Sequence, residues 1–139
     1  MPRYDTNLAS EFHVLACLHR LGMSTNLTLG NKKGVDVVVV RESGAAVTVE
    51  VKGLAGRYEW PASNLVDTKP LRPQDHSVAL VGFENRTGDV SMPPPSVWII
   101  PFPELEQFVS RYTNRSNMSR RKVLQNGERF RNAWSLIGG

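Results

Sequence analysis

The sequence predicts a single mixed α/β domain, and three patterns carry that prediction. An amphipathic stretch at residues 5–21 is typical of a helix, and β-branched runs at residues 35–41 and 46–52 are typical of paired strands. Further apolar runs at residues 78–84 and 97–100 add strands. Because these elements share one chain of 139 residues, we expect one central mixed sheet of four to five strands flanked by helices.

The first helix is predicted from apolar residues that recur at three- and four-residue steps. Leu8, Phe12, Leu15 and Leu18 follow that spacing, which places them on one face of a helix, and Gly22 is suited to end it. We therefore expect this face to pack against the sheet.

The early strands are predicted from β-branched residues and from the turns between them. Residues 42–45 have the composition of a hairpin connection between the two valine-rich runs. Residues 37–40 are apolar at every position, which indicates a strand buried on both faces. A short strand is also expected at residues 25–29, before a polar turn at residues 30–34.

The second half of the chain is less regular. Residues 53–77 predict a long loop that could hold a short helix or strand near residues 63–65. Proline and acidic residues in a first turn favour a helix at residues 103–112, and a last helix is expected at about residues 127–137. The apolar face of that last helix would consist of Phe130, Trp134 and Ile137.

Charge separates a core at about residues 5–102 from a basic C-terminal helical segment at about residues 103–139, within one domain. The net charge is +4. Between residues 111 and 131 seven cationic side chains face one acid, Glu128, which suggests a polyanionic partner or, equally, a solvated helix face. The cationic residues are Arg111, Arg115, Arg120, Arg121, Lys122, Arg129 and Arg131.

The remaining composition excludes several classes of protein. No segment has the roughly 18 apolar residues that a membrane helix needs, so no membrane partner is expected. The N-terminus lacks the apolar stretch of a signal peptide. Cys17 is the single cysteine, so no internal disulfide can form, and a cytoplasmic location is expected.

Two carboxylates and one ammonium group are predicted to meet on the paired strands. Glu50 and Lys52 are two positions apart and share a face, and the hairpin brings Asp36 opposite them. Charged groups in an apolar setting must be paired or bind a metal, and oxygen ligands suit Mg²⁺ or Mn²⁺. The alternative is a structural ion pair of Lys52 with either acid.

These residues resemble the motif of the PD-(D/E)XK nuclease superfamily, which includes restriction endonucleases and archaeal Holliday-junction resolvases. The motif is Gly34-Val35-Asp36 followed by Glu50-Val51-Lys52-Gly53, and the resemblance covers roughly residues 8–100. Val35 stands where the family has proline. The resemblance implies a restriction endonuclease-like core with the element order αβββαβ. It also implies that Asp36 and Glu50 bind the metal, that Lys52 is catalytic, and that Glu11 on the first helix is an additional metal-binding acid.

The expected function is therefore metal-dependent hydrolysis of phosphodiester bonds in nucleic acid, with DNA as the expected substrate. Mg²⁺ or Mn²⁺ would hold the phosphate, and Lys52 would assist an attacking water. Specificity would come from a homodimer or from a partner. The alternative is an inactive nucleic-acid-binding or interaction module that keeps the same fold.

Other residues are candidates for contacts with nucleic acid. Arg57 and Trp60 could touch phosphate or stack on a base, although Trp60 could equally fix the loop to the core. Arg120, Arg121 and Lys122 form a cluster suited to gripping a phosphate backbone.

Three further residues have functional and structural interpretations. His13 and Cys17 have the spacing of a metal pair, but no further ligands accompany them, so packing is the default. His76 could assist proton transfer, or could simply be a turn residue.

Overall fold

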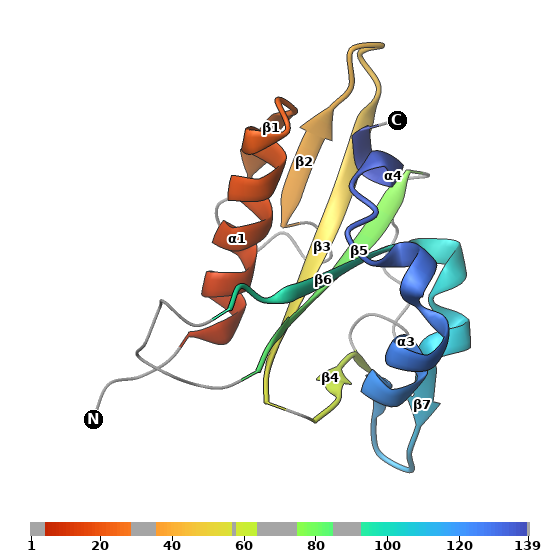
Figure 1. Ribbon diagram of the computed structural model, residues 1–139. Coiled ribbons are helices and arrows are strands. Elements are labelled where there is room, and N and C mark those ends of the chain that lie inside the picture. The colour runs from red at the N-terminus through yellow and green to blue at the C-terminus, as the bar shows by residue number, and fades with distance from the viewer. Residues whose placement is uncertain (1–4, 29–35, 57, 64–74, 85–92, 139) are drawn as a thin grey trace.

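The computed structural model describes residues 5–28, 36–56, 58–63, 75–84 and 93–138. A mixed five-stranded sheet lies at its centre, with the strand order β1-β2-β3-β5-β6 (Figure 1). β1, β2 and β3 pair antiparallel, β5 is parallel to β3, and β6 is antiparallel to β5. The predicted α/β class and central mixed sheet are confirmed. The strands are β1 (Ser24–Leu27), β2 (Val37–Val40), β3 (Ala46–Ala55), β5 (His76–Phe83) and β6 (Ser96–Pro101).

One face of the sheet is covered by helix α1 (Thr6–Arg20), which lies beside β1 and β2 in Figure 1. Asp5 caps the helix by accepting a hydrogen bond from the backbone N–H of Leu8 at 2.9 Å. The apolar residues between helix and sheet form what we call the helix-side cluster. Its buried members are Val14, Leu18, Val37, Val39, Val47, Val49, Val51, Ala79, Val81, Val97, Ile99 and Ile137.

The inward face of α1 differs from the predicted one. Ser10, Val14 and Leu18 are buried, whereas Leu8 and Phe12 are 44% and 52% exposed. Ser10, a small polar residue, lies where the helix comes closest to the sheet. The buried face of α1 is therefore less apolar in sequence than the face that the three- and four-residue spacing predicted. The prediction for Leu8 and Phe12 was therefore wrong.

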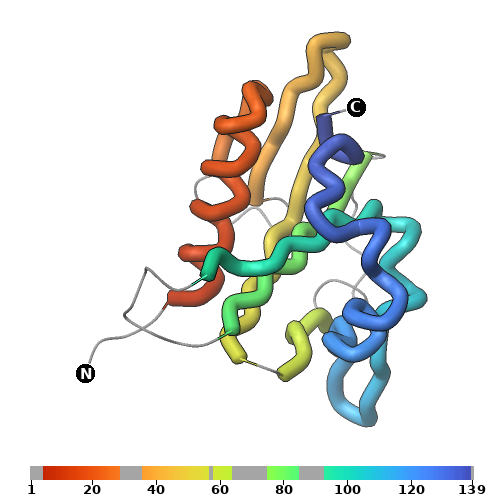
Figure 2. The backbone as a smooth tube through the Cα atoms, viewed as in Figure 1, coloured from red at the N-terminus to blue at the C-terminus, as the bar shows by residue number. Residues whose placement is uncertain are grey.

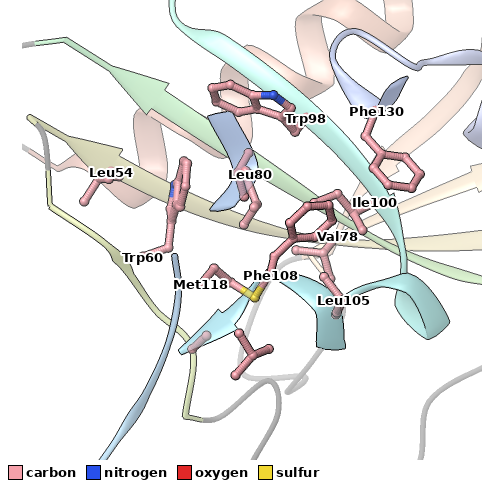
Figure 3. Packing of buried hydrophobic residues seen from close by; sticks show 13 residues of the cluster. Leu54, Trp60, Val78, Leu80, Trp98, Ile100, Leu105, Phe108, Met118 and Phe130 are labelled. Atoms are coloured by element: carbon pink, nitrogen blue, oxygen red, sulfur yellow. The ribbon is translucent and has the colours of Figure 1, made fainter. Parts of the chain in front are cut away.

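The other face of the sheet packs against a second, three-stranded sheet with the order β4-β8-β7 and against helix α3 (Arg120–Asn126). We call the core between them the second-sheet cluster; Figure 3 shows its two tryptophans and the rings of Phe108 and Phe130. The strands are β4 (Trp60–Pro61), β7 (Val109–Arg111) and β8 (Ser116–Met118). The buried residues are Leu54, Trp60, Ala62, Val78, Leu80, Trp98, Ile100, Leu105, Phe108, Val109, Met118, Val123 and Phe130.

The helix predicted at residues 103–112 does not form. The chain makes two short 3-10 turns, η1 (Phe102–Glu104) and η2 (Glu106–Phe108), and then enters β7. Val109 pairs with Met118 on β8, so a strand partner outside the segment overrides its local helical pattern.

The helix predicted at residues 127–137 is also wrong. It is replaced by the 3-10 turn η3 (Glu128–Phe130) and the short helix α4 (Ser135–Gly138). Between them Arg131 bridges to Trp98 on β6, and Asn132 has a φ of 52°. The chain therefore passes around the β6 edge of the sheet. Phe130 and Ile137 consequently lie in different clusters.

The C-terminal helix α4 returns to the end of the β2–β3 hairpin (Figure 2). Arg41 Nε donates a hydrogen bond to the carbonyl oxygen of Ile137 at 3.0 Å, and its Nη2 donates to that of Leu136 at 3.3 Å. This hydrogen bond joins residues 96 positions apart and attaches the C-terminal helix to the β2–β3 hairpin.

The predicted loop at residues 53–77 is shorter than expected at both ends. β3 continues to Ala55, β4 lies inside the segment, and β5 begins at His76. Residues 29–35 and 64–74, which hold the predicted turn and most of the expected piece near residues 63–65, lie outside the described residues. None of the helices in the described part of the chain has the length and apolar character for a membrane crossing.

Candidate active site

Asp36 lies at the start of β2 and is held by several hydrogen bonds. Its backbone N–H donates to the carbonyl oxygen of Val49 at 3.0 Å, and its own carbonyl accepts from the N–H of Thr28 at 2.9 Å. Its Oδ2 atom accepts from the backbone N–H of Val51 at 2.7 Å. Val51 separates Glu50 from Lys52, so the Asp36 carboxylate is tied to the centre of the Glu50-Val51-Lys52 motif.

Glu50 and Lys52 lie on the face of β3 opposite to α1. Val49 and Val51 belong to the helix-side cluster, and alternation along the strand turns Glu50 and Lys52 the other way. The Glu50 side chain is 7% exposed and the Lys52 side chain 25% exposed, with 3.6 Å between Oε2 and Nζ. The predicted proximity of these two charges is therefore present, in a largely buried setting.

Glu11 approaches the same region from α1. It is half-buried, and its carboxyl group makes a side-chain hydrogen bond with Asp36. Burial, followed by the neighbouring negative charge of Asp36, raises the pKa of Glu11 to about 7. Two acids are thus held close enough for one to retain its proton near neutral pH.

The close packing of α1 against β3 positions Glu11. Ser10, the residue before Glu11, is fully buried against Gly53, where any Cβ would clash with the Ser10 hydroxyl. The backbone N–H of Gly53 donates to Asn7 Oδ1 at 3.4 Å. Gly53 directly follows Lys52, so the helix is fixed to the strand that carries the motif.

The structure brings the acids together in pairs. Glu11 contacts Asp36, and Glu50 contacts Lys52 on the second-sheet side of β3. Within the described residues, which include all three acids, no group of three or more His, Cys, Asp or Glu side chains is arranged to hold a metal ion. The hydrogen bond from Val51 to Asp36 joins the two pairs through the backbone.

His76 is a site residue whose position the sequence did not reveal. It is 3% exposed, and its Nε2 atom lies 3.5 Å from Glu50 Oε1. Its neighbour in the parallel ladder is Thr48. The sequence did contain a clue to its burial. His76 is two and four positions before Val78 and Leu80, so in a strand it lies on the same buried face as these residues.

Trp60 is a core residue, which corrects its prediction as a nucleic-acid contact. It is 1% exposed, its Nε1–H donates to the carbonyl oxygen of Val81 at 3.1 Å, and its ring meets Trp98 edge to face (Figure 3). No ring face is available for a base. The alternative interpretation, in which Trp60 fixes the loop to the core, is confirmed, and Arg57 lies outside the described residues.

The three residues of the predicted basic cluster, at the start of α3, have different environments. Arg121 is exposed and Arg120 half-buried, and neither pairs with an acid from the described ranges. Lys122 is half-buried, and its Nζ donates to the carbonyl oxygen of Val109 at 2.7 Å. Lys122 therefore makes a structural hydrogen bond for which neither arginine has a counterpart within the described residues.

His13 and Cys17 contact each other on α1, with 3.6 Å between Nε2 and Sγ. Burial lowers the pKa of His13 and raises that of the Cys17 thiol. A thiol with a raised pKa is a poor nucleophile, so the Cys17 shift fits a packing role.

Comparisons of the chain with protein-family models, with curated proteins and with solved structures found no match.

Proposed function

We propose that the protein is a metal-dependent nuclease that hydrolyses phosphodiester bonds in nucleic acid, with DNA as the expected substrate. The contact between the carboxyl groups of Glu11 and Asp36 carries the proposal. Two neighbouring acids repel each other once both are ionised, and a divalent cation removes that repulsion. Carboxylate oxygens are the ligands that Mg²⁺ and Mn²⁺ prefer.

The arrangement of the motif supports the same proposal. Helix α1, the antiparallel strands β1 to β3 and the later strand β5 follow the order that the PD-(D/E)XK resemblance implies for these elements. Asp36 directly precedes β2, and Glu50 and Lys52 share a face of β3. These positions support the proposal.

Each residue then has a distinct role in hydrolysis. Glu11 and Asp36 would hold the cation. Glu50 would keep the Lys52 ammonium group in place through their ion pair. A bound Mg²⁺ or Mn²⁺ would offset phosphate charge and lower the pKa of a water molecule. The Lys52 ammonium group would orient the attacking water or stabilise the negative charge that develops on the phosphate. The burial of Glu50 strengthens such charge interactions by excluding water.

The direct test is cleavage of supercoiled, linear and branched DNA, and of RNA, in the presence of Mg²⁺ or Mn²⁺. We expect metal-dependent cleavage by the native chain and a loss of at least about 100-fold in Asp36→Asn and Lys52→Met. Glu42→Gln is the matched control, because Glu42 is an exposed acid in the β2–β3 turn. It should cleave at the native rate.

Two results would remove the proposal. One is an inactive native chain on every substrate with both ions. The other is equal activity in the native chain, Asp36→Asn and Lys52→Met, which would assign the cleavage to a different site or to a contaminating nuclease.

The second candidate function is a nucleic-acid-binding module without turnover. The exposure of Arg121, together with its lack of an acidic partner in the described ranges, favours this function. It predicts salt-sensitive DNA binding that needs no divalent cation and survives Asp36→Asn. Binding measured with EDTA present, at several salt concentrations, separates this candidate from the nuclease.

A further inference from the structure

The side of α1 that faces away from the sheet is apolar over most of its length. Leu8 and Phe12 are 44% and 52% exposed. Leu15 is half-buried, and Ala9 and Ala16 are exposed. Single exposed apolar side chains are common on protein surfaces, but a continuous apolar strip along one helix is typical of an interaction surface. We call these five residues the α1 strip.

The α1 strip consists of two rows of side chains with a ring between them. Leu8 and Leu15 are seven positions apart, and so are Ala9 and Ala16. Because seven residues make nearly two turns of helix, each pair forms a row along α1, one of large and one of small side chains. Phe12 lies between the rows, near the middle of the helix. The strip therefore has the same composition on both sides of its centre.

A second copy of α1 fits this strip when the two helices run antiparallel. A two-fold axis that crosses the helix beside Phe12 places the leucine row of each copy against the leucine row of the other, and the alanine rows likewise. Ala9 then lies opposite Ala16 of the second copy, where the short side chains let the helices approach closely. The Phe12 rings of the two copies meet at the axis.

The charges at the two ends of α1 favour the antiparallel direction. Asp5, which caps the start of the helix, and Arg20, in its last turn, are both exposed. In the antiparallel arrangement Asp5 of one copy lies beside Arg20 of the other, at both ends of the contact. In a parallel arrangement each charge would instead face its own copy and be repelled. Antiparallel helices also place opposite ends of their dipoles together. Shape and charge are thus complementary to a second copy of this chain.

We propose that the protein forms a symmetric homodimer through the α1 strip, with the two α1 helices antiparallel. This inference concerns assembly alone and does not depend on the nuclease function. A helix of 15 residues is about 22 Å long, so the contact lies at the low end of the sizes of specific interfaces. We therefore expect reversible association with a Kd of roughly 1–100 µM.

Sedimentation equilibrium, over chain concentrations that bracket this range, measures the association. Phe12→Asp brings two acids together at the two-fold axis and should weaken the dimer by at least about 10-fold. Leu124→Asp is the matched control, because Leu124 is 50% exposed but lies on α3, and it should associate like the native chain. A native chain that stays monomeric throughout, or a Phe12→Asp variant that associates as strongly as the native chain, overturns the inference.

Disulfide cross-linking tests the direction of packing. In a Cys17→Ala background, which removes the native thiol, we compare Ala9→Cys, Ala16→Cys and a mixture of the two variants. The mixture should form a disulfide-linked heterodimer, because positions 9 and 16 lie opposite each other. Each variant alone should cross-link poorly, because its two thiols would be about 10 Å apart along the helices.

Two cross-linking results contradict the proposed arrangement. Efficient cross-linking of each variant alone, without the mixed product, would show that the helices are parallel. No cross-linking of the mixture, at concentrations where the native chain is dimeric, would place the interface elsewhere. Because these variants keep Phe12, they decide the arrangement even if Phe12→Asp does not fold.

Discussion

The carboxylate of Asp36 accepts a hydrogen bond from the backbone N–H of Val51 at 2.7 Å, so this acid links the start of β2 to the middle of β3. Its backbone N–H is bonded to the same strand, at Val49. Asp36 is therefore a structural residue as well as the proposed cation ligand. Any substitution at this position changes both roles unless the replacement keeps an acceptor.

The first prediction separates these two roles of Asp36. Asp36→Ala leaves the Val51 N–H without its partner and should lower the free energy of unfolding by about 1–3 kcal/mol. Asp36→Asn keeps an oxygen acceptor and should be less destabilised, while losing the negative charge that attracts a cation. Urea denaturation in EDTA tests this. Equal stability of the two variants would show that the hydrogen bond contributes little.

The second prediction concerns the pH dependence of stability caused by Glu11. The pKa of Glu11 is about 7 in the folded chain, against an ordinary value of 4.5, so folding favours the protonated acid. That stabilisation is fully present below pH 4.5 and is lost as pH rises through 7. Glu11→Gln should therefore gain stability relative to the native chain across this window, by about 1 kcal/mol after allowance for solvent screening.

Urea denaturation at pH 4.5 and pH 8 in EDTA measures this difference, and Glu42→Gln, at an exposed turn, is the control. Parallel curves for Glu11→Gln and the native chain would contradict the prediction. Added Mn²⁺ at pH 8 should stabilise the native chain more than Glu11→Gln, because a cation and a proton relieve the same repulsion.

The sequence was sufficient to predict the elements that carry the motif. The β-branched runs of β2 and β3 and the turn between them determine the hairpin, and the hairpin brings Asp36 beside the residues around Glu50. These signals are local, since pairing across a short turn needs no distant partner. The proximity of Glu11 to Asp36 was expected from the family resemblance, which implies an additional acid on the first helix.

The parts that could not be predicted depend on distant contacts. Val109 fits a helical pattern with Leu105, but its pairing with Met118 places it in a strand. Phe130 and Ile137 have helical spacing, yet the chain crosses the sheet edge at Asn132 between them. In both cases a tertiary contact outweighs the local preference.

The third prediction tests the contact that places α1. A Cβ at Gly53 would clash with the Ser10 hydroxyl and lie 2.8 Å from the Thr6 carbonyl oxygen, so the helix would have to move. Gly53→Ala should cost about 1–3 kcal/mol of stability and also weaken Mn²⁺ binding, because Glu11 moves with the helix. Gly82→Ala is the matched control, since its Cβ would meet only Trp60 and Trp98, at 3.6 Å. If the two variants are equally stable, the close packing does not position α1.

The fourth prediction separates the neighbouring cations of α3. Arg121 is exposed, whereas the Lys122 ammonium group donates to the Val109 carbonyl at 2.7 Å. If this surface contacts phosphates, Arg121→Ala should reduce the slope of log affinity against log salt concentration by about 0.9, with little change in stability. Lys122→Ala should instead lower the free energy of unfolding by about 1 kcal/mol, because the Val109 carbonyl loses its partner.

Fluorescence anisotropy with labelled DNA across a salt series, together with urea denaturation, measures both quantities. Equal slopes for the native chain and Arg121→Ala would place the nucleic-acid contact elsewhere, because a phosphate contact cannot be removed without changing the number of counterions released.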